Sequence, residues 1–334
     1  MASNKSYILA SRPTRDAPAG VQNFKLVESE TGPLADGETL VRNHFLSLDP
    51  YMRGRMNDAA SYAEPQPLNE VMTGATVGEV VESRNPRFAV GDMVSLTGGW
   101  QNYTKTSGRD MRRIDASAVP PQTHLGILGM TGVTAWYGLT KILAPREGET
   151  IVVSAATGAV GSVVGQLARR AGAHVVGIAG GKEKCAFAKE TLGFHECVDH
   201  RSETFGDDLK SAAPRGIDCL FENVGGLPFA RSIRLLNVFS RTAICGLVAS
   251  GYDGTPTPLP DMRLLLEKRA SMEGFIVSDH LDIWPQAVSE LAQHVKAGKM
   301  HWRETIAEGL EAAPQAFFSM LKGGNFGKQL VKLL

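Results

Sequence analysis

The sequence predicts an α/β protein with two domains: a β-barrel-like domain and a doubly wound parallel sheet of the Rossmann type. The chain has 334 residues, which is more than one hydrophobic core usually contains. Short β-rich runs separated by turn residues fill the sequence up to about Arg113, whereas helices and strands alternate from Thr123 onward. A glycine-rich turn at residues 154–161 joins a buried strand to a helix, as in dinucleotide-binding sheets.

The first domain is expected to be an antiparallel β domain. Its β-rich runs are ETLVRNHFLSLDP at residues 38–50 and VMTGATVGEVVESRNPRFAVGDMVSL at residues 71–96. The second run contains turn signals at Asn85-Pro86 and at Val90-Gly91-Asp92. Short strands at such spacing are typical of a barrel-like sheet.

The second half of the chain alternates apolar helices and strands. One helix is predicted over residues 124–142, ending before Pro145, and another over residues 160–172, closed by Gly172. Strands separated by helices indicate βαβ units and a parallel sheet. Further apolar runs bounded by glycine or proline predict strands at 150–155, 173–180, 216–226, 241–249 and 271–278, with a helix near 230–236.

The C-terminal residues 313–334 contain a predicted helix that Gly323-Gly324 stops and a final strand, KQLVKLL. Because the parallel sheet already has six strands, we expect this segment to return to the first domain. The expected division is 1–124 for the first domain, 125–300 for the Rossmann domain and 301–334 for the returning segment.

The composition argues against several classes of protein. Lys and Arg number 35, as do Asp and Glu, so the formal net charge of zero favours neither nucleic acid nor an anionic membrane as a partner. The N-terminal residues contain no apolar segment of signal-peptide length, and the longest uncharged window, 150–168, is too polar to span a membrane. The four cysteines, Cys185, Cys197, Cys219 and Cys245, show no CxxC spacing, which is typical of a cytoplasmic protein.

A catalytic metal ion is not expected. Zinc needs Cys, His or carboxylate ligands that converge on one site. The first domain contains no cysteine and only His44, and His124 lies beyond it at the domain junction. The sequence also contains no HExxH helix motif and no GxSxG nucleophile turn.

The glycine-rich turn SAATGAVG places Ala156, Gly158 and Gly161 at the three glycine positions of the GxGxxG fingerprint. Ala156 can replace the first glycine if that residue keeps a negative φ. Gly158 lets the backbone approach a pyrophosphate, and Gly161 lets the following helix pack closely on the strand. The alternative is a tight strand-to-helix turn that binds nothing.

The tip of the second Rossmann strand predicts NADP(H) as the cofactor. An acidic residue about 20 positions after the turn would bind a ribose 2′-hydroxyl and favour NAD. Here Ile178 and Ala179 are followed by Gly-Gly-Lys-Glu-Lys, so no carboxylate occupies the tip, and Lys182 and Lys184 can pair with a 2′-phosphate. Alternatively the lysines form a solvated start of a helix, and Glu183 leaves NAD open.

Eight stretches in register resemble one family. They are LSLDPYMRGRM (Leu46 to Met56), GMTGVTAWYGL (Gly129 to Leu139), SAATGAVGSVVGQLA, GGKEKCAFAKETLGF, FENVGG, AICGLVASGY, MEGFIV and LKGGNFGK. They are similar to the zinc-free medium-chain dehydrogenase/reductases, and within them to the leukotriene B4 dehydrogenase, prostaglandin reductase and double-bond reductase family, especially the bacterial NADPH-dependent curcumin reductases. The resemblance covers nearly the whole chain and implies a GroES-like catalytic domain beside a Rossmann domain.

The resemblance also implies which residues bind the cofactor. His200 stands where the family often has a tyrosine at the 2′-phosphate, which makes the affinity for NADPH dependent on pH. The implied contacts are Gly158, Ala159, Val160 and Gly161 at the pyrophosphate, Lys184 and His200 at the 2′-phosphate, and Asn223, Cys245, Gly246, Leu247, Val248, Phe275, Ile276, Val277 and Asn325 elsewhere.

The activity implied by the resemblance is reduction of the carbon–carbon double bond of an α,β-unsaturated ketone or aldehyde. Without a metal, hydrogen-bond donors must stabilise the enolate oxygen, and Tyr252 is the first candidate, with the cofactor's ribose hydroxyl as another. Tyr51 and Tyr62 are expected in the substrate cleft, or else they are structural tyrosines at a barrel edge and on a loop. A quinone reductase and an NADPH-binding protein without turnover are alternatives, and relatives suggest a homodimer.

Overall fold

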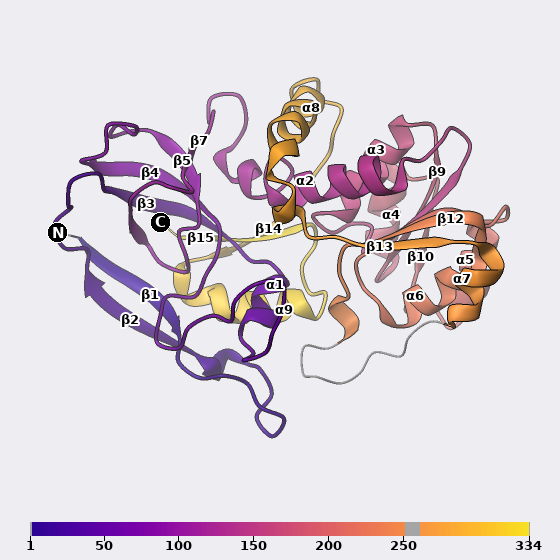
Figure 1. Ribbon diagram of the computed structural model, residues 1–334, viewed down its shortest axis with the longest axis horizontal. Helices are drawn as coiled ribbons and strands as arrows, with labels where there is room; N and C mark the ends of the chain where they lie inside the picture. Colours follow the sequence, from indigo (N-terminus) through magenta and orange to yellow (C-terminus); the bar gives the residue numbers. More distant parts are fainter. Residues whose placement is uncertain (1, 251–260, 334) are drawn as a thin grey trace. The chain divides into compact units, whose positions relative to one another are not determined.

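Figure 1 shows the computed structural model, which describes residues 2–250 and 261–333. The chain divides into two compact units. The first combines Met1–Gly126 with Glu304–Leu334, and the second is Ile127–Arg303. Each unit has its own sheet, so the predicted α/β fold class is confirmed.

The second unit is built on a six-stranded sheet in the order β10-β9-β8-β11-β12-β13. All neighbouring strands run parallel, and the order reverses between β8 and β11, as in a Rossmann fold. The strands are β8 (Thr150–Ser154), β9 (His174–Ala179), β10 (Glu196–Asp199), β11 (Ile217–Glu222), β12 (Leu236–Ile244) and β13 (Ser271–Gly274).

Helices cover this sheet, because its strands are apolar on both faces. Phe205 and Leu209 of α5 and Phe229 of α6 pack on Val152, Val176, Ile178 and Leu220 of the strands. The helices are α2 (Met130–Tyr137), α3 (Gly161–Arg170), α4 (Lys182–Glu190), α5 (Phe205–Ala212), α6 (Gly226–Ser232), α7 (Met262–Lys268) and α8 (Trp284–Lys296).

The prediction of a single helix over residues 124–142 is wrong for the first half of this range. A 3₁₀ turn, Pro121–Leu125, precedes α2, and a π-helix, Gly138–Leu143, follows it. Gly126 and Gly129 break the helix because both have non-helical backbone angles. The chain at Ile127 then passes so close to Gly132 that a β-carbon on Gly132 would lie 1.8 Å from the Ile127 carbonyl oxygen.

The helix predicted near 230–236 is also displaced. It begins earlier, as α6, and ends in a 3₁₀ turn, Ile233–Leu235. Leu236 is already the first residue of β12, where it pairs with Ile217 and is 1% exposed. Burial against the sheet therefore decides the state of this residue, and helix propensity does not.

The first unit is mostly antiparallel. Its seven-stranded sheet has the order β14-β15-β3-β4-β5-β7 with β6 also paired to β3, and β1 and β2 form a separate hairpin. The elements are β1 (Ser3–Leu9), β2 (Phe24–Glu30), β3 (Thr39–Ser47), α1 (Tyr51–Arg55), β4 (Thr76–Ser83), β5 (Met93–Leu96), β6 (Tyr103–Thr106), β7 (Arg112–Arg113), β14 (Glu304–Glu308), α9 (Ala313–Leu321) and β15 (Lys328–Lys332).

The C-terminal strand β15 is bound tightly to β3. The two strands pair antiparallel, and a buried ion pair joins their ends. Lys328 Nζ lies 2.8 Å from Asp49 Oδ1 and donates to the Leu48 carbonyl oxygen at 2.8 Å. The aromatic core beside them stacks Trp100 on Phe24, with ring centroids 4.9 Å apart.

Candidate cofactor-binding site

The carboxyl ends of the six parallel strands gather most of the predicted cofactor residues at one edge of the second unit. Strand ends in parallel sheets form the binding crevice, especially where the strand order reverses. The segments that follow the strands are Ala155–Gly161 after β8, Gly180–Gly181 after β9, His200 after β10, Asn223–Gly225 after β11, Cys245–Val248 after β12 and Phe275–Val277 after β13.

The turn after β8 offers backbone donors to an anion. Ala155 adopts the left-handed conformation at φ +49°, and its carbonyl accepts the Gly158 N–H at 2.8 Å. Ala156, at the first glycine position, has no positive φ, as expected from its β-carbon. The N–H groups of Ala159 and Val160 donate to no other residue that the structure describes, and they precede the N-terminus of α3. Such a turn can bind a pyrophosphate.

The two glycines of the turn differ in how closely they are packed. A β-carbon on Gly161 would lie 2.3 Å from the Ala155 carbonyl oxygen, which is backbone and cannot move aside. A β-carbon on Gly158 would have only that oxygen nearby, at 3.1 Å, and the residue is half-buried. The packing at Gly161 is what the fingerprint predicts for its third position, and the role of Gly158 at a pyrophosphate stays a prediction.

A buried carboxylate shapes the loop after β11. Glu222 is fully buried, and its Oε1 accepts the Ser154 hydroxyl at 2.9 Å and the N–H groups of Val224 and Gly225 at 2.5 and 2.7 Å. Asn223 completes the link, since its side chain donates to the Ser154 carbonyl at 2.8 Å. Burial raises the pKa of Glu222, and its hydrogen bonds act in the opposite direction. The signal missed in the sequence was a glutamate at the end of an apolar strand.

The segment after β12 lies along this loop. The N–H groups of Cys245 and Gly246 donate to the Glu222 carbonyl at 2.9 and 3.2 Å, and the Val248 N–H donates to the Asn223 carbonyl at 3.4 Å. Burial raises the pKa of the Cys245 thiol to about 12, so the thiol stays protonated at neutral pH. Leu247 is exposed.

The residues after β13 extend the same edge. Phe275 donates its N–H to the Ile244 carbonyl at 3.4 Å, and its ring contacts Tyr137 with centroids 5.5 Å apart. Ile276 follows in an extended conformation, and Val277 is buried. Residues 275–277 are therefore adjacent to the segment that begins at Cys245.

The tip of β9 carries the groups expected at a 2′-phosphate. Lys184 lies in the first turn of α4, and His200 pairs with the tip through its N–H, 3.0 Å from the Ala179 carbonyl. Burial lowers the pKa of Lys184, and nearby Arg201 lowers it further. Glu183 is 80% exposed and approaches Arg303 at 4.0 Å. The Glu183 carboxylate, which could have favoured NAD, thus forms an ion pair with Arg303.

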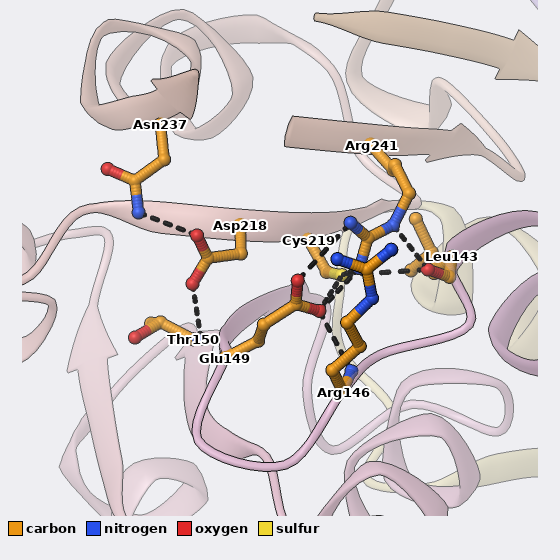
Figure 2. Close-up of polar contacts among 8 residues, drawn as sticks. All are labelled: Leu143, Arg146, Glu149, Thr150, Asp218, Cys219, Asn237 and Arg241. Atoms are coloured by element: carbon orange, nitrogen blue, oxygen red, sulfur yellow. Dashed lines mark hydrogen bonds and ion pairs between the residues drawn. The ribbon is translucent and has the colours of Figure 1, made fainter. Parts of the chain in front are cut away.

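A second polar cluster lies at the amino-terminal ends of the strands (Figure 2). Arg241 donates to the Glu149 carboxylate and, at 2.5 Å, to the Leu143 carbonyl at the end of the π-helix. Cys219 lies 3.0 Å from Arg241 Nη2, but burial raises the pKa of its thiol to about 12. The buried thiol is not a nucleophile, and the cluster fixes the chain before β8.

Of the three tyrosines proposed from the sequence for catalysis and substrate binding, Tyr51 and Tyr62 belong to the first unit and Tyr252 does not. Tyr51 is the first residue of α1, where burial raises the pKa of its hydroxyl, and Tyr62 is 61% exposed but close enough to interact with it. Asn325 donates to the Gly327 carbonyl at 2.7 Å before β15. Tyr252 lies outside the described residues.

Neither a cluster of metal-binding side chains nor a membrane-spanning helix is found in the described ranges. Within residues 2–250 and 261–333, no three His, Cys, Asp or Glu side chains gather in a way that could hold a metal ion. No helix in the same ranges is long and apolar enough to cross a membrane.

The chain matches known oxidoreductases over almost its whole length. Residues 5–114 match the N-terminal domain of oxidoreductase, and residues 159–293 match zinc-binding dehydrogenase. The NADPH-dependent curcumin reductase of Escherichia coli (strain K12) is 46% identical over 99% of this chain and 97% of that protein. The 2-alkenal reductase (NADP(+)-dependent) of Nicotiana tabacum is 37% identical over 98% and 97%. The crystal structure of CurA in complex with NADPH from Vibrio vulnificus has a TM-score of 0.92 at 46% identity, covering 99% of each chain.

A Rossmann sheet with a glycine-rich turn after β8, on a chain this similar to NADP-dependent reductases, defines an oxidoreductase. The chain belongs to the medium-chain dehydrogenase/reductase family. The resemblance stated from the eight sequence motifs is thereby confirmed.

Alanine at the two turn glycines should separate folding from cofactor binding. Gly161→Ala forces a β-carbon onto the Ala155 carbonyl and should destabilise the protein by about 1–3 kcal/mol, the usual cost of overpacking. Gly158→Ala should lower the melting temperature less but weaken NADPH binding at least about tenfold, because the methyl group blocks the approach of the pyrophosphate. Thermal unfolding and a fluorescence titration with NADPH measure both effects. Equal effects of the two variants on stability and affinity would contradict the assignment.

The affinity for NADP⁺ should increase as pH falls, because His200 takes up a proton when the 2′-phosphate binds beside it. Burial lowers the pKa of His200, with further lowering by Arg201 and Lys184 and a rise from Asp199, so the free imidazole is neutral at pH 7. A 2′-phosphate beside it raises that pKa, so binding takes up a proton and tightens as pH falls through the pKa of the complex. If binding makes the imidazole about tenfold more basic, Kd falls by up to about tenfold over this range. Titrations between pH 8 and 6 should give a steeper slope for the wild type than for His200→Gln. Parallel slopes would exclude His200, because the phosphate's own titration is common to both proteins.

Proposed function

We propose that the protein is an NADPH-dependent reductase of the carbon–carbon double bond in α,β-unsaturated ketones and aldehydes. The observation that carries this proposal is the 46% identity, over 99% of the chain, to a curcumin reductase. The site supports it, because the phosphate-binding turn and the cations after β9 and β10 lie on one edge of the sheet. The 2-alkenal reductase relative supports the same substrate class.

NADPH supplies the hydride when it is bound, and the protein supplies orientation and charge stabilisation. The N–H groups of Ala159 and Val160 bind the pyrophosphate, and Lys184 and His200 bind the 2′-phosphate. Residues 275–277 lie near the nicotinamide carboxamide, and Asn223, residues 245–248 and Asn325 are further contacts of the cofactor. The protonated Cys245 thiol adds no charge there.

Hydride arrival at the β carbon of an enone leaves negative charge on the carbonyl oxygen, and a hydrogen-bond donor must stabilise that enolate. We assign this role to Tyr252, helped by the ribose hydroxyl of the cofactor. Solvent or a tyrosine then protonates the α carbon. Tyr51 and Tyr62 belong to the substrate cleft. The raised pKa of Tyr51 keeps its hydroxyl protonated, so it can act as a neutral donor.

The domain roles follow the same assignment. Residues 1–124 and 301–334 form the GroES-like catalytic domain, and residues 125–300 bind the cofactor. We propose further that the protein is a cytoplasmic homodimer. Gel filtration with light scattering distinguishes a dimer of about 72 kDa from the 35.8 kDa monomer.

Stopped-flow loss of NADPH absorbance tests the function. The purified protein is mixed with NADPH and a simple enone, a benzoquinone or no acceptor. Rapid oxidation with the enone, and a saturated ketone as product, is expected. Turnover with the quinone alone would replace the proposal by a quinone reductase, and NADPH binding without oxidation would leave a protein that only binds the cofactor.

Replacing Tyr252 by phenylalanine should reduce turnover more than substrate binding, because only the donor is removed. Loss of one such donor typically costs on the order of 10² in kcat, or about tenfold if the ribose hydroxyl shares the role. Tyr252→Ala is the matched comparison, since it also removes the ring. Both variants are measured at saturating NADPH. A phenylalanine variant with unchanged kcat would remove Tyr252 from the catalytic residues.

A further inference from the structure

The Arg201 side chain lies along the glycine pair at the tip of β9. A β-carbon on Gly180 would lie 3.1 Å from Arg201 Nε and 3.2 Å from its Cζ, and one on Gly181 would lie 3.7 Å from Nη1. The guanidinium therefore lies next to this turn, in the space that a side chain at Gly180 would occupy. Gly181 has φ +98°, a conformation that favours glycine, so the turn is built without a side chain at its apex.

One carboxylate fixes the position of Arg201. Asp199 Oδ1 accepts the Gly181 N–H at 2.9 Å and the Arg201 N–H at 3.0 Å. The turn after β9 and the turn after β10 are thus joined through a single oxygen. The Arg201 guanidinium itself makes no hydrogen bond or ion pair with another described residue, although it is exposed and charged.

Three cationic or titratable groups converge at this tip. A β-carbon on Gly180 would also lie 2.9 Å from His200 Nε2, and Arg201 lowers the pKa of both Lys184 and His200. Repulsion between the Lys184 and Arg201 charges is unfavourable in the free protein, and protonation of His200 would add to it. An anion placed between them would relieve it, and the oxygen of Asp199 nearest the turn already accepts two backbone donors.

We propose that Arg201 is a specificity-determining residue that binds the 2′-phosphate of NADPH together with Lys184. The inference rests on the proposed use of NADPH and names a residue that neither the motifs nor the resemblance had assigned. A planar guanidinium can donate two parallel hydrogen bonds to one phosphate, which a lysine cannot. Gly180 and Gly181 place no side chain against the guanidinium, and Arg201 is exposed, so an anion can reach it from solvent.

Calorimetric titration with adenosine 2′,5′-bisphosphate and with 5′-AMP isolates this contact without turnover. For Arg201→Gln, affinity for the bisphosphate should fall roughly tenfold to a hundredfold, as for other charge-assisted contacts, and affinity for 5′-AMP should not change. Arg201→Lys should recover only part of the loss, because the charge remains but the two-pronged geometry does not. Lys210→Gln, which removes an exposed cation of α5, is the matched control and should bind both nucleotides normally.

Two results would overturn the assignment of Arg201: unchanged bisphosphate affinity in Arg201→Gln, or an equal loss for both nucleotides. Either leaves the proposed reductase intact if the wild type still prefers the bisphosphate. A wild-type protein that binds the two nucleotides equally would instead refute the use of NADPH, and the inference with it. Melting temperatures of all variants identify any general loss of folding.

Discussion

The carboxylate of Glu222 holds together the point where the Rossmann sheet reverses its strand order. Its Oε1 binds the Ser154 hydroxyl of β8 and two N–H groups of the loop after β11, so the adjacent ends of two strands share one acceptor. A buried carboxylate is costly unless it is well hydrogen-bonded. Three donors meet Oε1, whereas Oε2 has no hydrogen-bond partner among the described residues, and burial raises the pKa of the group. The Cys245 segment is attached in turn through the Glu222 carbonyl. Removal of this group would loosen the β8, β11 and β12 ends together.

The two phosphate subsites that we propose work by different physics. The turn after β8 uses neutral N–H groups and a helix N-terminus, whose effect is short-ranged and partly shielded by the protein. The tip of β9 uses side-chain charges of Lys184 and Arg201 near solvent. Salt screens exposed charges over about 10 Å at 0.1 M. The preference for NADPH over NADH should therefore depend on ionic strength more strongly than the affinity for the pyrophosphate does. Cofactor selectivity and cofactor affinity are thus partly independent properties of one site.

The sequence predicted what depends on neighbouring residues. The spacing of Gly158 and Gly161 is local, and the strand before it and the helix after it follow from short apolar patterns. The Ser154–Glu222 contact joins residues 68 positions apart, and Arg201 meets Gly180 from another strand, so no local pattern signals either one. The helical periodicity over residues 124–142 gave no sign of the break at Gly126 and Gly129. That break depends on the close approach of the chain to Gly132, which is a tertiary contact. The roles of Tyr51, Tyr62 and Tyr252 came from the resemblance and remain proposals.

The return of β15 to β3 has a consequence for biosynthesis. Lys328 and Asp49 are 279 positions apart, yet their buried contact completes the sheet of the first unit between β14 and β3. A ribosome makes the entire second unit, residues 127–303, before it makes the strand that the first unit needs. The nascent first unit therefore waits with residues 45–47 of β3 unpaired on one side, since β6 pairs only with residues 39–42, and an open strand segment of this kind can pair with other chains. The first unit begins to be synthesised first, yet it is the last that can finish folding. The time for which its open strand stays exposed is set by the length of the second unit, which is inserted between its two parts.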